Sequence, residues 1–144
     1  MLSRTTQIKV SWGHCDPAGI IYYPNYFRWF DACTHGLLEA IGLDQRVMAD
    51  KYDVLGLPLV DAGSSFVTPT TFGDVIQART TVEKLGRASV HLSHVFHRGE
   101  DLILNGHEVR VWTGPDPQNP ELMTGLPLPD DVRALLSEDR TYEG

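Results

Sequence analysis

The sequence predicts an α+β fold in which one long helix packs on an antiparallel sheet of five strands. Apolar residues recur at helical spacing between Pro24 and Gly42, which predicts one long amphipathic helix. Along five other segments apolar and polar residues alternate, which predicts strands, and short loops that join the later segments favour antiparallel pairing. A chain of 144 residues has the usual size of one domain, so residues 1–144 are expected to form a single domain.

The amino-terminal part is expected to contain a strand, a turn and the long helix. Residues 5–12 alternate between apolar and polar side chains, as a half-buried strand does. Residues 13–19 contain an Asp-Pro pair and two glycines, which favour a turn. The helix is expected to begin at Pro24, since proline suits a first helical turn, and to end at Gly42. Its apolar stripe consists of Tyr26, Phe30, Cys33, Leu37 and Ile41.

The rest of the chain is expected to form a four-stranded meander and a short tail. Residues 44–56 are polar and are expected to be irregular apart from a short helical turn. Alternation, with turn residues between the segments, predicts strands at residues 60–66, 75–85, 88–97 and 102–112. Residues 114–120 are typical of a loop and residues 130–136 of a short capped helix, and the last residues are expected to fray.

The charge and the composition argue against several classes of protein. With 12 basic and 19 acidic side chains the formal net charge is −7, which disfavours nucleic acid or an anionic membrane as the main partner. No apolar run approaches the roughly 20 residues that cross a bilayer, and residues 1–7 lack the apolar core of a signal peptide. Two cysteines do not make a disulfide framework, so a cytoplasmic protein is expected.

A single helix on one antiparallel sheet leaves the opposite face and the edges of the sheet uncovered. Oligomerisation is a common way to cover such surfaces. A homodimer or a homotetramer is therefore expected, and the sequence leaves open which of the two forms.

The segment between residues 14 and 31 contains the groups best suited to chemistry. Asp16 lies in the turn before the long helix, and the helix start at Tyr23 offers unpaired backbone N–H groups and the positive end of the helix dipole. Such a pair suits acyl transfer, because the N–H groups hold a developing oxyanion while the carboxylate attacks the carbon or activates a water. The alternative is that Asp16 only stabilises the turn, since Asp-Pro-x-Gly is ordinary turn chemistry.

The stretch from Gly13 to Asp31 reads GHCDPAGIIYYPNYFRWFD. Its Asp-Pro-Ala-Gly-Ile run, followed at fixed spacing by Tyr-Pro-Asn-Tyr, resembles the signature of the 4-hydroxybenzoyl-CoA thioesterase family. The resemblance implies the hotdog fold, in which a five-stranded antiparallel sheet wraps a long central helix. It also implies hydrolysis of an aromatic acyl-CoA to the free acid and coenzyme A at a subunit interface. No metal or redox cofactor is implied, and coenzyme A enters only as part of the substrate and product.

The same resemblance implies roles for particular residues. The family's catalytic carboxylate falls on Asp16, as nucleophile or general base, and the backbone N–H that polarises the thioester carbonyl falls on Tyr23. A second acidic position, near the ring hydroxyl of the acyl group, falls on Asp31, for which a solvated position on the helix is the alternative. Tyr22 and Trp29 are candidates for an aromatic pocket, although aromatic residues near a helix start are often part of a core.

Two further groups complete the candidate site. In the family, basic side chains on the sheet hairpins meet the phosphates of coenzyme A, which points to Lys84 and Arg87, with Arg98 as a third candidate. Each of these cations is equally compatible with a solvated surface position. Gly63 and Ser64 are candidates for lining the pocket, because glycine admits the close approach of a ligand.

Other functions compete with thioester hydrolysis. The main alternatives are a non-catalytic hotdog module that binds acyl-CoA or an acyl-carrier protein, and a thioesterase for short or medium aliphatic acyl-CoA. A dehydratase is disfavoured, because that chemistry uses a histidine where this chain has Tyr-Pro-Asn-Tyr. A thiol nucleophile at Cys15 is disfavoured, because the neighbouring His14 points to the opposite face of an extended segment. A metal site is not expected, because strand alternation puts His91 and His97 on one face and His94 on the other.

Overall fold

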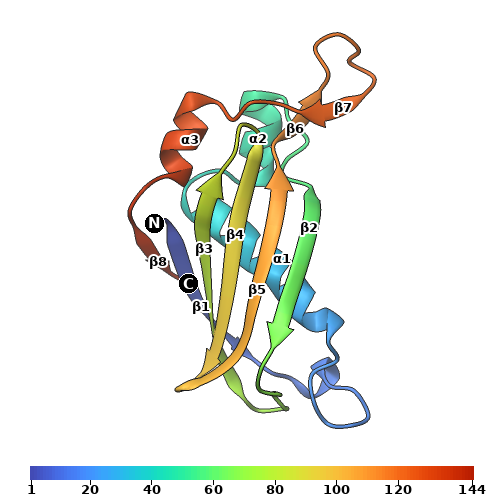
Figure 1. Cartoon of the computed structure of the whole chain (residues 1–144), viewed down its shortest axis with the longest axis vertical. Coiled ribbons are helices and arrows are strands. Elements are labelled where there is room, and N and C mark those ends of the chain that lie inside the picture. Colours follow the sequence, from blue (N-terminus) through green and yellow to red (C-terminus); the bar gives the residue numbers. More distant parts are fainter.

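A computed structural model describes residues 1–144 of the chain (Figure 1). Helix α1, Pro24–Ala40, lies across one face of a six-stranded sheet, and Figure 1 shows the sheet from its other side. The α+β fold predicted from the sequence, one long helix wrapped by an antiparallel sheet, is confirmed. None of the helices has the length and apolar content needed to span a membrane.

The sheet consists of five long strands and one short strand. The long ones are β1 (Ser3–Lys9), β2 (Leu59–Phe66), β3 (Val75–Leu85), β4 (Ser89–Arg98) and β5 (Asp101–Val111). They pair antiparallel in the order β2-β5-β4-β3-β1. The first strand ends earlier than predicted, because the chain turns into the short 3-10 helix η1 at Trp12–His14.

The sixth strand, β8 (Thr141–Glu143), corrects two predictions, the five-strand count and the frayed chain end. It adds in parallel to β1, which would otherwise be an edge strand with unpaired backbone groups. The N–H of Ser3 donates to the carbonyl of Arg140 at 2.9 Å, so the end of the chain is held to the sheet.

The predicted four-stranded meander is wrong in one connection. Strand β2 pairs with β5 and not with β3, its neighbour in the sequence. Both edges of β3 are already occupied by β1 and β4, so residues 67–74 carry the chain from one edge of the sheet to its middle. This crossing brings residues 66–71 beside the amino-terminal end of α1, where the candidate site lies.

Helix α1 packs on the sheet through the predicted stripe, all five members of which are buried. The ring of Phe30 stacks on the imidazole of His94 with 4.4 Å between the ring centres. Gly106 of β5 lies against the same ring, and a Cβ there would come within 2.3 Å of Phe30 Cζ. The helix therefore approaches the sheet so closely at Phe30 that only glycine fits opposite it.

The remaining elements lie at one end of the sheet (Figure 1). Residues 45–52, predicted to be largely irregular, form helix α2 (Gln45–Tyr52), which Asp44 caps by accepting a hydrogen bond from the N–H of Val47 at 2.9 Å. Helix α3 (Asp130–Leu136) is confirmed within the predicted bounds. The predicted loop lies largely in a projecting hairpin formed by β6 (Thr113–Pro115) and β7 (Met123–Gly125).

Candidate active site

The segment between η1 and α1 folds into a small hairpin. Cys15 pairs with Ile21 in an antiparallel bridge, and the N–H of Asp16 donates to the carbonyl of Ile20 at 2.9 Å. Gly19 closes the turn with a φ of +81°, a conformation that glycine adopts without strain. The turn predicted at residues 13–19 is therefore formed.

Side chains from two other elements fix this hairpin in place. The buried amide of Asn25, in the first turn of α1, donates to the carbonyl of His14 at 2.8 Å. The hydroxyl of Thr71, in the crossing segment after β2, donates to the carbonyl of Gly19 at 2.5 Å. The hairpin is therefore tied both to the helix start and to the β2–β3 connection.

Asp16 lies half-buried at the base of the turn. Its Oδ1 accepts a hydrogen bond from the N–H of Ala18 at 2.8 Å, while Oδ2 has no partner within the chain. The first contact is the turn-stabilising role considered as the alternative. The second oxygen remains available to a substrate or a water molecule.

Tyr23 carries an unpaired backbone N–H at the start of the 17-residue helix α1. The next residue, Pro24, has no N–H. The N–H groups of Asn25 and Tyr26 are bound to the carbonyls of Tyr22, at 2.9 Å, and Tyr23, at 3.1 Å. The Tyr23 N–H is thus an unsatisfied donor at the positive end of the helix dipole.

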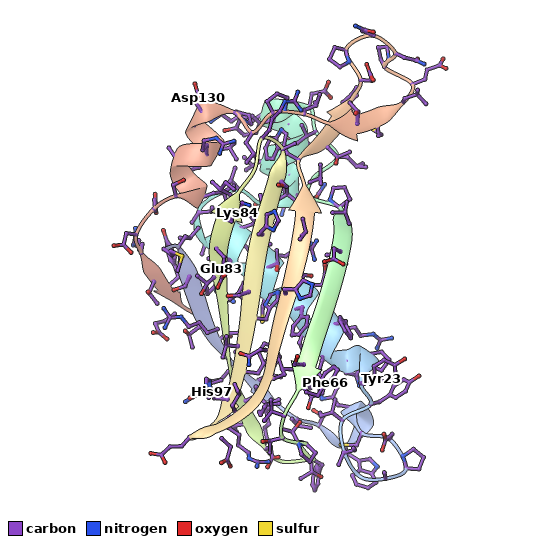
Figure 2. All side chains as sticks on the ribbon, viewed as in Figure 1. Tyr23, Phe66, Glu83, Lys84, His97 and Asp130 are labelled. Carbon is purple, nitrogen blue, oxygen red and sulfur yellow. The ribbon has the colours of Figure 1, made fainter.

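An apolar pocket of about 220 Å³ lies beside Tyr23. Its lining comprises Ile20, Ile21, Tyr23, Tyr26, Phe66, Val67, Thr68, Pro69 and Thr70. Figure 2 shows Tyr23 and Phe66 close together at the end of the molecule where β2 ends and α1 begins. Asp16 is not part of this lining. Its N–H is bound to the carbonyl of Ile20, and Ile20 lies three residues before Tyr23 in the sequence. Three residues of extended chain span roughly 10 Å.

The two other aromatic candidates lie around this pocket without lining it. Tyr22 is exposed, and its ring meets that of Tyr23 edge-on with centres 5.8 Å apart. Trp29 is half-buried against His14 and Tyr26, with ring centres 5.1 and 5.6 Å away. It lines a separate groove between β1 and α1.

The two small candidates, Gly63 and Ser64, lie in the middle of β2 and outside the pocket lining. A Cβ at Gly63 would come within 2.6 Å of the His107 ring, whose Nε2 lies 3.0 Å from Asp61 Oδ2. Ser64 donates to the carbonyl of Asn105 at 3.2 Å. In a single chain, Gly63 therefore makes room for a histidine side chain.

The three candidate cations are split between the two ends of the sheet. Lys84 and Arg87 lie at the β3–β4 turn, and Figure 2 shows Lys84 far from Tyr23 along the long axis of the molecule. Arg98 lies at the end nearer the pocket, paired with Asp74 at 2.9 Å and Asp101 at 3.3 Å. One chain alone does not bring Lys84 and Arg87 to Tyr23.

A buried polar network, which sequence reasoning missed, lies between α1 and the sheet. Glu108 is at its centre: Oε1 accepts from the Thr34 hydroxyl at 2.5 Å and lies 3.0 Å from His94 Nε2, and Oε2 accepts from Arg110 Nη2 at 2.7 Å. His94 Nδ1 lies 2.8 Å from the Thr80 hydroxyl. All five side chains are buried.

The charges of this network compensate each other. Burial raises the pKa of Glu108, but hydrogen bonds from His94, Arg110 and Thr34 outweigh it and hold the pKa at about 2. Burial lowers the pKa of Arg110, and the Glu108 carboxylate more than reverses this. With His94 Nε2 beside Glu108 and Nδ1 beside Thr80, no buried side-chain polar atom of the network is left without a partner.

The series formed by the Thr80 hydroxyl, the His94 imidazole and the Glu108 carboxylate resembles a nucleophile with its base. However, Thr80 and His94 are fully buried and border no pocket. Their contacts stabilise the packing of α1 on the sheet. Alternation along β5 contained a usable signal, because Glu108 and Arg110 occupy the same face as Leu104 and Trp112.

Asp31 lies where this network reaches the surface. Its Oδ1 accepts from Arg110 Nη2 at 2.8 Å and lies 3.4 Å from His35 Nε2, and its side chain is 59% exposed. Asp31 therefore differs from a freely solvated helix residue, because a buried guanidinium fixes one of its oxygens.

The histidines of β4 lie on the faces that strand alternation predicts. His94 is buried, whereas His91 and His97 lie half-exposed on the other face of β4. No group of three or more potential metal ligands is found. The expectation that His14 lies on an extended segment is wrong, because His14 is the last residue of the 3-10 helix η1. Its Nδ1 accepts from the N–H of Ser11, and no hydrogen bond joins His14 to Cys15.

The chain is similar to known proteins over nearly its whole length. Residues 10–136 match the thioesterase-like superfamily. The 4-hydroxybenzoyl-CoA thioesterase of Pseudomonas sp. (strain CBS-3) is 32% identical over 141 residues, which cover 94% of this chain and 98% of that protein. A crystal structure of a mutant 4-hydroxybenzoyl CoA thioesterase complexed with 4-hydroxybenzoyl CoA superposes with a TM-score of 0.84 at 31% identity, over 95% of this chain and 100% of that one. A gentisyl-coenzyme A thioesterase superposes with a TM-score of 0.77 at 32% identity, over 93% and 99% of the two chains.

Proposed function

The chain belongs to the thioesterase-like superfamily and is a hotdog-fold thioester hydrolase, and from this premise we propose that it hydrolyses an aromatic acyl-CoA. The products are the free acid and coenzyme A. Two relatives at about one-third identity are named for aromatic acyl groups, 4-hydroxybenzoyl and gentisyl. An aryl thioester is therefore favoured over a short or medium aliphatic one.

The observation that carries the mechanism is the unpaired N–H of Tyr23 at the start of α1. A thioester carbonyl placed in the adjacent apolar pocket accepts this hydrogen bond, and the helix dipole adds a field of about half a unit charge at the developing oxyanion. The apolar lining strengthens both effects, because it excludes water from the carbonyl.

Asp16 supplies the carboxylate, since its Oδ2 has no other partner. As a nucleophile, Oδ2 attacks the thioester carbon, the carbon–sulfur bond breaks, the thiolate of coenzyme A leaves and water then hydrolyses the acyl anhydride. As a general base, Asp16 takes a proton from the water that attacks the carbon. Either course needs no metal or redox cofactor, because a thioester is activated and its thiolate leaves without prior protonation.

The acyl group is proposed to lie along α1 from Tyr23 toward Asp31. Tyr23, Phe27 and Asp31 are spaced four residues apart and share one face of the helix over roughly 12 Å. The ring of Phe27 lies 6.5 Å from that of Phe66, so an aryl group in this position has apolar neighbours. The free oxygen of Asp31 is then available to a hydroxyl at the far end of the ring.

The active unit is proposed to be a homodimer or a homotetramer with the site at a subunit interface. Strand β2 is an unpaired edge of the sheet, and Leu59, Val60 and Phe66 on it are about half exposed or more. Pairing with a second chain would cover this edge. Contact between chains would also bring Asp16 and the cations Lys84 and Arg87 toward a site that one chain leaves incomplete.

The proposal is tested by following thiol release from benzoyl-CoA, 4-hydroxybenzoyl-CoA and a medium-chain acyl-CoA. We expect the highest kcat/KM for an aromatic thioester, because this ratio reports discrimination in the transition state. Binding of the acyl-CoA without any thiol release would support the non-catalytic module instead. Sedimentation of the purified protein tests the assembly, and an active monomer would contradict an interfacial site.

A further inference from the structure

The buried network around Glu108 has a feature that packing alone does not require: it reaches the surface at a single carboxylate, Asp31. Arg110 is 4% exposed, yet its Nη2 donates both to Glu108 Oε2 at 2.7 Å and to Asp31 Oδ1 at 2.8 Å. The guanidinium of Arg110 is thus shared between a buried acid and an exposed one.

Four hydrogen bonds fix the orientation of this guanidinium. Besides the two from Nη2, Nε donates to Glu108 Oε1 at 3.3 Å and Nη1 donates to the carbonyl of Leu57 at 3.1 Å. A planar group held at three of its nitrogens has little rotational freedom left. Asp31 is therefore bound by a rigid partner, unlike an ordinary surface ion pair between two flexible side chains.

The contact also determines what Asp31 can recognise. With Oδ1 bound to Arg110, Oδ2 has no partner within the chain, and this oxygen can only accept a hydrogen bond while the carboxylate is ionised. Asp31 lies on the same helix face as Tyr23 and Phe27. A group bound along this face meets an immobilised acceptor about two helical turns from the unpaired N–H of Tyr23.

We propose that Arg110 is a positioning residue that fixes Asp31 so that the enzyme selects aroyl thioesters with a hydrogen-bond donor at the far end of the ring. This inference rests on the proposed thioesterase function. The guanidinium does not touch the substrate; it holds the carboxylate of Asp31 in a fixed orientation. Unsubstituted rings leave that carboxylate without a partner, and rings with a terminal carboxylate are repelled by it.

The test is the ratio of kcat/KM for 4-hydroxybenzoyl-CoA to that for benzoyl-CoA, measured on the full-length protein. Asp31→Asn should lower this ratio by about tenfold, the value of a hydrogen bond to a charged group. Arg110→Lys should lower it by about three- to tenfold, because an ammonium cannot bridge Glu108 and Asp31 in the same way. Arg79→Lys, a matched change on the exposed face of β3, should leave the ratio unchanged.

A double-mutant cycle separates positioning from stability. Loss of folded protein lowers the rates for both substrates equally and leaves the ratio unchanged. In the Asp31→Asn background, Arg110→Lys should have no further effect on the ratio, since Arg110 acts on the substrate only through the carboxylate of Asp31, which this background lacks. If Arg110→Lys does not fold, the double variant Glu108→Gln with Arg110→Met removes both buried charges, and it should lower the ratio to that of Asp31→Asn.

The outcomes distinguish this inference from the function on which it rests. A wild-type protein that releases thiol from neither substrate overturns both. A wild-type protein that hydrolyses both substrates, with a ratio that Arg110→Lys leaves within twofold of wild type, overturns the positioning role alone. Equal effects of Arg110→Lys in the wild-type and the Asp31→Asn backgrounds would also contradict it.

Discussion

Replacing Glu108 by glutamine should remove a specific part of the pH dependence of stability. Glu108 has a pKa of about 2 in the folded protein against an ordinary value of 4.5. Since the folded-state pKa is lowered, the stabilisation is fully present above about pH 4.5 and is lost as the pH falls toward about 2. A difference of about 2.5 in pKa corresponds to roughly 3 kcal/mol at neutral pH.

The assay is urea unfolding followed by circular dichroism at pH 7, 5, 4 and 3. The Glu108→Gln variant should be less stable than the wild type by about 3 kcal/mol at pH 7, and this gap should shrink by roughly 2 kcal/mol between pH 5 and pH 3. The matched control Glu100→Gln changes an exposed glutamate in the β4–β5 turn, and its unfolding free energy should stay within about 0.5 kcal/mol of wild type. A gap for Glu108→Gln that does not vary with pH would refute the idea that a buried, ionised Glu108 stabilises the fold.

Two other substitutions test the packing of α1 and the source of the oxyanion donor. Gly106→Ala should destabilise the protein by about 1–3 kcal/mol, because the added Cβ would come within 2.3 Å of Phe30 Cζ. Thermal unfolding measures this loss of stability. Gly13→Ala, where a Cβ meets nothing within 4 Å, is its control, and equal losses would contradict the close approach. Tyr23→Ala should lower kcat far less than Asp16→Asn, because the proposed donor at Tyr23 is a backbone N–H that the substitution keeps. Steady-state kinetics of both variants measure the difference. An equal loss of kcat would mean that the Tyr23 side chain takes part.

Local patterns predicted the elements well. The stripe from Tyr26 to Ile41 fixed the position of α1, because each helical turn returns an apolar side chain to the sheet. Alternation located the five long strands, but it says nothing about which strand is the neighbour of which. The pairing of β2 with β5 and the parallel addition of β8 depend on which edges are free after the chain has folded.

Those features of the candidate site that depend on local structure, the helix start at Tyr23 and the turn at Asp16, were predictable from the sequence. Tyr23 stands at the helix start because Pro24 begins the helix, and the unpaired N–H follows from that. For Asp16 the sequence left two alternatives, a turn residue and a catalytic carboxylate; Oδ1 makes the turn contact, and the catalytic role stays a prediction. The contact between Asp31 and Arg110 was harder to anticipate, because it joins residues 79 positions apart.

The most direct test of the catalytic account is kcat for hydrolysis of 4-hydroxybenzoyl-CoA by the Asp16→Asn variant. Asparagine keeps the Oδ1 that accepts from Ala18, so the turn, the circular dichroism spectrum and the affinity for the ligand should be preserved. The variant lacks a nucleophilic or basic oxygen, so kcat should fall by more than about 1000-fold. A kcat within tenfold of wild type would contradict the account, because the carboxylate of Asp16 would then not be the group that drives the cleavage of the thioester.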